Sequence, residues 1–146
     1  MNAVVVGTTL RQDGCCRGGA ISAQTLTSGD GYVEFTVAEV DTQRTAGLSN
    51  GNTDTSGSDI DFGISFNGAG SAEVRENGVY RWDTGYASGD VFRVAVVGNQ
   101  VWYSKNGVVF YTSARAPTYP LLVDTSLMSA GSTTSQAVIS GSLARP

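Results

Sequence analysis

Aromatic and charged side chains occur together between residues 81 and 102, in a region of short β-strand patterns. Sugars present apolar C–H faces that stack on aromatic rings, while Arg and Asp side chains hydrogen bond to their hydroxyl groups. The candidate ligand-binding residues are therefore Arg81, Trp82, Asp83, Tyr86 and Trp102. The competing interpretation is structural, because aromatic residues of a β-sheet commonly lie in the core or cover a sheet edge.

The chain contains no histidine. This excludes every Ser–His or Cys–His nucleophile arrangement and every metal site that depends on imidazole. The sequence therefore predicts a protein that is not an enzyme and that has no cofactor, apart from a calcium ion in one loop.

That loop runs from Asn50 to Asp61. Counted from Asn50, oxygen-bearing side chains fall at positions 1, 3, 5, 7, 9 and 12, the spacing of a helical calcium loop. Position 6 is Thr55 rather than glycine, and position 12 is Asp rather than Glu. If calcium binds, the expected ligands are Asp54, Asp59 and Asp61; the alternative is a solvated, turn-rich loop.

The 146 residues fit one domain, and a hydrophobic fraction of 40% is enough for a globular core. Nine Lys and Arg against thirteen Asp and Glu give a net charge of −4, which argues against binding nucleic acid or an anionic membrane surface. No apolar run is long enough to insert into a membrane. The first residues lack the features of a signal peptide.

Hydrophobic residues alternate in short runs with no 3.6-residue period, so the chain is predicted to be all-β. The stretch 89–113 reads as three strands joined by turns at 98–99 and 106–107, with Trp102 facing away from Val101 and Tyr103. Tyr80 and Trp82 are expected to share one face of their strand. Further strands are expected at 3–9, 19–26, 32–37, 44–48, 60–66, 72–76, 79–82, 121–126 and 136–140, with a domain core over about 3–140 and a tail over 141–146.

Cys15 and Cys16 are adjacent in the sequence. A bridge between neighbouring cysteines requires a strained ring, so the simplest interpretation is two thiols in a turn. A vicinal disulfide or a contact with a soft metal ion remains the alternative. The pair is no disulfide framework and does not indicate a compartment.

Six phrases of the chain are informative in their order: Ser28–Thr36, Ala46–Gly51, Asp59–Phe62, Gly89–Val96, Lys105–Gly107 and Ala116–Ser126. These phrases resemble a recurrent module of bacterial extracellular proteins. The order of Gly-Asp, strand, turn, strand, Asn-Gly, strand and a later Tyr-Pro also resembles the SPRY domains. Both belong to the concanavalin A-like jelly-roll group, so the resemblance, over roughly residues 3 to 140, implies an antiparallel two-sheet β-sandwich.

Members of this group bind glycans, hydrolyse glycosidic bonds or bind protein loops. Its glucanases carry Glu-x-Asp-x-x-Glu on one strand, and none of the glutamates of this chain stands in that motif. The resemblance therefore implies a non-catalytic binding module, most readily for carbohydrate, attached to a larger bacterial secreted or cell-surface protein. The alternative is a protein-interaction or assembly module, SPRY-like or part of a surface or phage fibre protein, with Val97 and Trp102 buried between subunits of a homo-oligomer.

Overall fold

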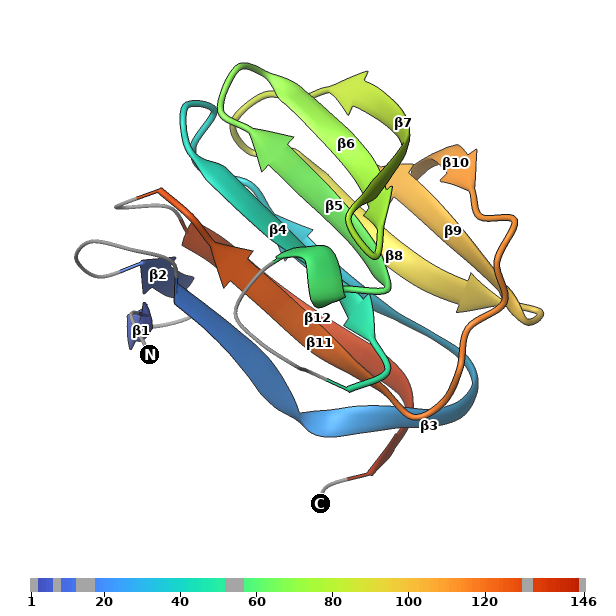
Figure 1. Cartoon of the computed structure of the whole chain (residues 1–146). Coiled ribbons are helices and arrows are strands. Elements are labelled where there is room, and N and C mark those ends of the chain that lie inside the picture. The colour runs from blue at the N-terminus through green and yellow to red at the C-terminus, as the bar shows by residue number, and fades with distance from the viewer. Residues whose placement is uncertain (1–2, 7–8, 13–17, 52–56, 130–132, 145–146) are drawn as a thin grey trace.

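Two antiparallel β-layers face each other across one core (Figure 1). The computed structural model describes residues 3–6, 9–12, 18–51, 57–129 and 133–144. Sheet 1 runs β3–β11–β4–β5–β6–β7, and sheet 2 runs β12–β3–β8–β9–β10. The predicted two-sheet β-sandwich is therefore confirmed. The strands are β1 Ala3–Val6, β2 Thr9–Gln12, β3 Gly18–Thr36, β4 Gln43–Ser49, β5 Phe62–Asn67, β6 Ser71–Glu76, β7 Val79–Gly85, β8 Val91–Val97, β9 Gln100–Lys105, β10 Val108–Thr112, β11 Leu121–Leu127 and β12 Thr133–Ala144, with a 3₁₀ turn η1 at Gly57–Asp59.

Strand β3 belongs to both layers. Its first part, from residue 18 to 26, pairs with β11, and its last part, from 31 to 36, pairs with β8. The sequence predicted two separate strands with a turn at 28–31, and this is wrong. The strand remains continuous because β12 pairs with it on both sides of the bend, where Gly29 takes a positive φ of 68°.

Two other boundaries differ from the expected ones. The opening segment forms a hairpin of β1 and β2, where one strand followed by a polar turn was expected. The last strand continues to Ala144, into the expected tail, because Ser142, Leu143 and Ala144 pair with Ser28, Leu26 and Thr25 of β3. Cys15 and Cys16 lie outside the described residues.

The core fills the space between the two sheets, and alternation predicts most of it correctly. Phe66 lies near its centre, with ring centroids 4.9 Å from Tyr86, 5.1 Å from Phe92 and 6.1 Å from Phe35. Ile60 is the exception. It is fully buried, but its Cγ2 lies near Gly63 on the face of sheet 1 that points away from the core, so it does not share the face of Phe62.

Arg44 is the largest buried polar side chain of this region, with 2% of its surface exposed. Its guanidinium donates to the carbonyl oxygens of Thr42 and Glu39 and lies 4.8 Å from the centre of the Phe66 ring. Burial lowers the pKa of Arg44, because the charged form loses hydration. Backbone carbonyls and an aromatic face thus hold this charge inside the sandwich.

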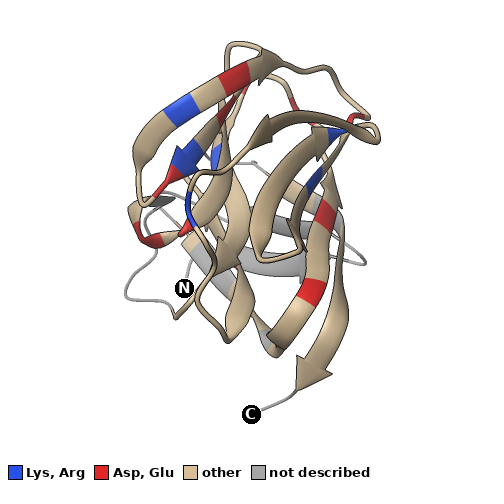
Figure 2. Cartoon of the chain, turned by 90° about the vertical axis from the view of Figure 1, so that its right-hand side faces the viewer, with Lys and Arg blue, Asp and Glu red and all other residues tan. Residues whose placement is uncertain are grey.

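The sandwich is closed by β3 and β12 on one side and open on the other, where β7 and β10 are the free edges. Side chains join the layers at this open side. The Tyr103 hydroxyl donates to Glu76 Oε2 at 3.0 Å, and Lys105 Nζ donates to the Gly85 carbonyl at 2.9 Å. Figure 2 views this side and shows acidic and basic segments interspersed, without a continuous stretch of one sign. Within the described ranges, no helix has the length and apolar character needed to cross a bilayer.

We expect the free energy of unfolding to fall as the pH rises above about 10. Burial raises the pKa of Tyr103, and the adjacent Glu76 carboxylate raises it further. The unfolded chain therefore releases this proton first, so stability is present below the unfolded pKa and lost above it. Urea unfolding between about pH 8 and about pH 11 should show a shallower decline for Tyr103→Phe than for the wild type. Equal declines would contradict the assignment.

Candidate binding surfaces

A groove lies on the outer face of sheet 2, the face that points away from the core. We call it the Trp102 groove; it has a volume of about 330 Å³. Its floor is built from the residues of β8 and β9 that alternate with the core residues Phe92, Val94, Val101 and Tyr103. The lining residues are Glu34, Val91, Arg93, Ala95, Val97, Trp102, Ser104, Gly107 and Val109.

An ordered ion pair crosses the groove. The Nε and Nη2 atoms of Arg93 donate to Glu34 Oε2 at 2.9 and 2.7 Å, and the guanidinium lies 3.7 Å from the centre of the Tyr32 ring. Both charged side chains are partly exposed, so the pair contributes little to stability. Its effect is to hold a planar donor group and a carboxylate at fixed positions in the groove.

Trp102 lies beside these groups and faces outward, as the alternation of β9 predicts. Its side chain is 36% exposed, and its indole Nε1 donates to Gln100 Oε1 at 3.1 Å. Ser104 shares this outer face, as expected, but is buried. The groove therefore combines one aromatic surface, an apolar wall and a few fixed polar groups, a composition typical of ligand sites.

Trp82 and its neighbours lie elsewhere, on the free edge strand β7. A β-bulge shifts the register there, so that Tyr80 lies opposite Arg75 while Trp82 lies opposite Val74. Because Arg75 and Val74 are adjacent in β6, the two aromatic residues are on opposite faces, and the expected shared face is wrong. Trp82 takes the core-facing side at the open edge and is 54% exposed.

Arg81 and Asp83 are each engaged with a neighbour. Arg81 Nε lies 3.4 Å from Oε1 of the buried Glu76, at the open side of the sandwich. Asp83 accepts a hydrogen bond from the Tyr80 hydroxyl on the outer face of sheet 1, and this bond raises the pKa of Tyr80. The two residues thus point to different surfaces.

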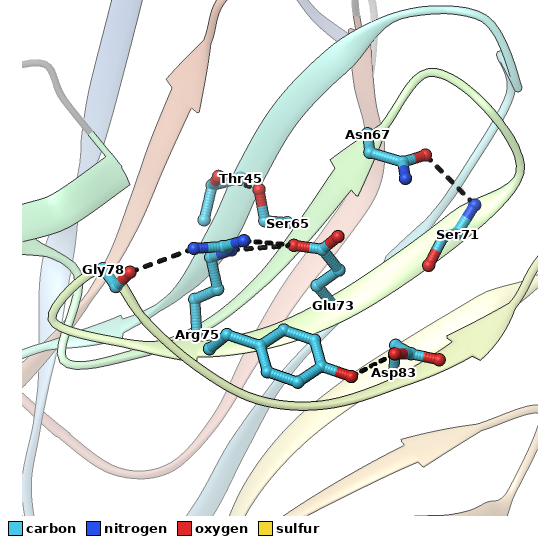
Figure 3. Close-up of polar contacts among 9 residues, drawn as sticks. Thr45, Ser65, Asn67, Ser71, Glu73, Arg75, Gly78 and Asp83 are labelled. Carbon is cyan, nitrogen blue, oxygen red and sulfur yellow. Dashed lines mark hydrogen bonds and ion pairs between the residues drawn. The ribbon is translucent and has the colours of Figure 1, made fainter.

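The outer face of sheet 1 near Asp83 is shown in Figure 3. Arg75 donates to Glu73 Oε1 at 2.8 Å and to the Gly78 carbonyl at 3.1 Å. Thr45 Oγ1 donates to Ser65 Oγ at 3.0 Å on the neighbouring strands. These polar groups hydrogen bond to one another within the sheet. They do not point together toward a common position where a ligand could bind.

Tyr86 is a core residue. It is 9% exposed, and its ring packs edge-to-face against Phe66. A ligand cannot stack on this ring, so its assignment to the ligand-binding set is corrected. The structure therefore does not bring the five predicted residues together, and Trp102 alone of them lines the groove.

In the predicted calcium loop, both carboxylate oxygens of Asp61 accept hydrogen bonds from protein groups. Its Oδ2 accepts from the Asn50 amide at 2.9 Å, and its Oδ1 accepts from Asn77 Nδ2 at 2.8 Å. These two bonds hold the Asp61 carboxylate between the loop and the turn after β6. Asp59 ends η1, Asp54 lies outside the described residues, and the described part of the chain contains no cluster of three acidic or thiol side chains able to hold a metal.

A second hollow lies at the end of the β8–β9 hairpin. We call it the hairpin-tip pocket; its volume is about 310 Å³. Gln100 lines this pocket and also accepts the hydrogen bond from Trp102, so one side chain contacts both the pocket and the indole of the Trp102 groove. Sequence reasoning missed the pocket because half of it comes from the connector after β10, which carries no strand pattern. The lining residues are Gly98, Asn99, Gln100, Ser113, Ala114, Arg115 and Ala116.

No protein-family model and no curated relative matches the sequence. Solved structures do match. The SPRY domain of human HERC1 has a TM-score of 0.67 at 14% identity, covering 97% of this chain and 93% of that one. The carbohydrate recognition domain of Emp46p has a TM-score of 0.70 at 10% identity, covering 97% and 84%. The exoplasmic/lumenal domain of VIP36 has a TM-score of 0.71 at 7% identity, covering 99% and 81%.

The fold is the concanavalin A-like jelly roll. SPRY domains and L-type lectin domains share it, as the resemblance of the sequence phrases implied. At these identities the likeness shows the fold alone, so the function of this jelly roll depends on its own surfaces.

We expect Asp61→Ala to lower the free energy of unfolding by about 1–2 kcal/mol, because the Asn50 and Asn77 donors lose their acceptor. Adding calcium or a chelator should leave the melting temperature of the wild type unchanged. A bound ion would stabilise the folded state and raise that temperature, and such a rise, lost in Asp61→Ala, would instead support calcium binding in this loop.

Proposed function

We propose that this jelly roll is a non-catalytic binding module that takes a carbohydrate in the Trp102 groove. The observation that carries the proposal is the partly exposed indole of Trp102, oriented by Gln100 and placed beside a fixed Arg–Glu pair. An indole face suits the C–H face of a sugar ring. The adjacent guanidinium and carboxylate suit its hydroxyl groups.

The polar groups of the groove support binding rather than hydrolysis. Glycoside hydrolysis requires two carboxyl groups on either side of the scissile bond, at about 5–9.5 Å from one another. The described lining of the groove includes one carboxylate, Glu34, and Arg93 already neutralises it. The groove is near the lower end of the usual size of ligand sites, about 300–1,000 Å³, which suits a short saccharide.

The similar structures support the same class of ligand. One VIP36 structure is described as bound to calcium and mannose, and the Emp46p domain is described as a carbohydrate recognition domain in a metal-free form. Because VIP36 is described as exoplasmic or lumenal, we extend the proposal to location: the module belongs to the extracellular or cell-surface part of a larger, bacterial protein.

A second candidate function, assembly with another protein chain, is favoured by the open side of the sandwich. There Val79, Trp82 and Val108 are 51%, 54% and 69% exposed on the two free edge strands. Exposed apolar side chains beside unpaired strand edges are a common feature of protein contacts. Trp82 does not line the Trp102 groove, so variants of Trp82 and Trp102 test the two functions independently.

We expect the wild type to bind saccharides on a glycan array and Trp102→Ala to lose the signal. Truncating a central aromatic residue of a binding site costs about 2 kcal/mol or more, which is about a thirtyfold loss of affinity. The matched control is Trp82→Ala, which removes a more exposed indole outside the groove and should bind normally. If the wild type gives no binding signal with any saccharide on the array, the proposal is overturned.

The assembly function predicts concentration-dependent association of the wild type in light scattering. Trp82→Asp should weaken that association by about thirtyfold or more, because it places a charge in an apolar contact. Trp102→Ala serves as its control and should associate normally. A wild type that stays monomeric at high concentration would remove this candidate as a self-assembly surface.

A further inference from the structure

We infer that the hairpin-tip pocket binds a carboxylate group through Arg115, so that the module prefers acidic saccharides to neutral ones. The inference rests on the proposed carbohydrate function and adds the chemical class of its ligand. It starts from the pairing of the arginine side chains.

Arg115 differs from the other partly exposed arginines. Arg75, Arg81 and Arg93 each have a glutamate oxygen within 3.4 Å. In the described part of the chain Arg115 forms no such ion pair. Among the described residues, its guanidinium donates to the backbone carbonyl of Asp61, from Nη1 at 3.4 Å. A guanidinium has five N–H donors, so most of its hydrogen-bonding capacity is unused.

The position of Arg115 is nevertheless fixed. Its backbone N–H donates to Ser113 Oγ at 3.0 Å, and the Ser113 amide donates to the Val101 carbonyl at 2.8 Å. Its guanidinium carbon lies 5.2 Å from the centre of the Phe62 ring. A guanidinium held against an aromatic ring loses less entropy on binding, and its planar fork matches a carboxylate.

The other lining groups are consistent with a charged sugar. Asn99, Gln100 and Ser113 bring amide and hydroxyl groups to the pocket. One acidic side chain reaches the same hairpin tip: Asp30 Oδ1 accepts from the Gly98 amide at 2.9 Å, which occupies that oxygen. The pocket thus offers hydrogen-bond donors together with a cation that has no carboxylate partner.

Gln100 connects this pocket to the Trp102 groove. It accepts a hydrogen bond from the indole with Oε1 and also lines the pocket, so we place the neighbouring unit of a saccharide stacked on Trp102 at the hairpin tip. A carboxylate on that unit would meet Arg115. The combined site would therefore recognise a uronate or sialate unit adjacent to a stacked sugar ring.

The test uses uronate and sialate oligosaccharides together with their methyl esters, which keep the sugar ring and remove the charge. Calorimetry on the wild type should show the free acid binding about tenfold to hundredfold more tightly than its ester, the range expected for a charge-assisted hydrogen bond. Arg115→Gln should bind both forms with the affinity of the ester. Arg115→Lys keeps the positive charge but loses the planar pair of N–H donors, so it should retain part of the preference for the acid over the ester.

The outcomes separate the two proposals. Equal binding of acid and ester by the wild type, or a preference that survives in Arg115→Gln, overturns the carboxylate pocket and leaves the carbohydrate function standing. Failure of the wild type to bind any saccharide overturns both. If an Asp- or Glu-rich peptide binds through Arg115 while no acidic sugar does, the ligand class is wrong. Thermal melts of both Arg115 variants confirm that they are folded, and Trp102→Ala should lose acid and ester alike.

Discussion

The pairing of β3 with β12 on both sides of the bend is the constraint on which the rest of this molecule depends. Because one strand pair contributes to both layers, the sheets are joined on that side and must diverge toward β7 and β10. The joined side fixes which residues of every later strand face the core. The two kinds of surface described above follow from this arrangement: an outer sheet face with the Trp102 groove, and an open side with exposed edges.

Much of this architecture could be predicted from short-range patterns. The turns at 98–99 and 106–107 were expected from their Asn and Gly residues, and all four residues have positive φ values. Alternation also placed Phe35, Phe92 and Tyr103 correctly in the core. The continuity of β3 could not be predicted, because a Ser-Gly-Asp-Gly sequence indicates a turn unless a neighbouring strand bridges it.

The candidate site was less predictable for physical reasons that differ from residue to residue. A bulge at β7 changes the face on which Trp82 lies. The alternation of side chains along a strand, read from sequence, does not reveal such an inserted residue. Tyr86 lies just after a strand, where alternation assigns no direction, and long-range packing with Phe66 decides its burial. The charged residues are hardest of all. Arg44 and Arg115 have the same side chain, yet tertiary contacts bury one among carbonyl oxygens and leave the other at a pocket.

The Tyr103–Glu76 and Lys105–Gly85 contacts have a consequence for local unfolding. At the open side, the layers are joined by these side-chain bonds, whereas at the closed side they are joined by backbone ladders. Local unfolding can therefore begin at the edge strands β7 and β10, while β3 and β12 stay paired. Amide protons of β7 and β10 then exchange with solvent through small fluctuations, while those near the bend exchange only when the whole sandwich unfolds. The Trp102 groove includes both kinds of backbone: its β3 residues lie where amide protons exchange slowly, and its β10 residues lie where they exchange fast.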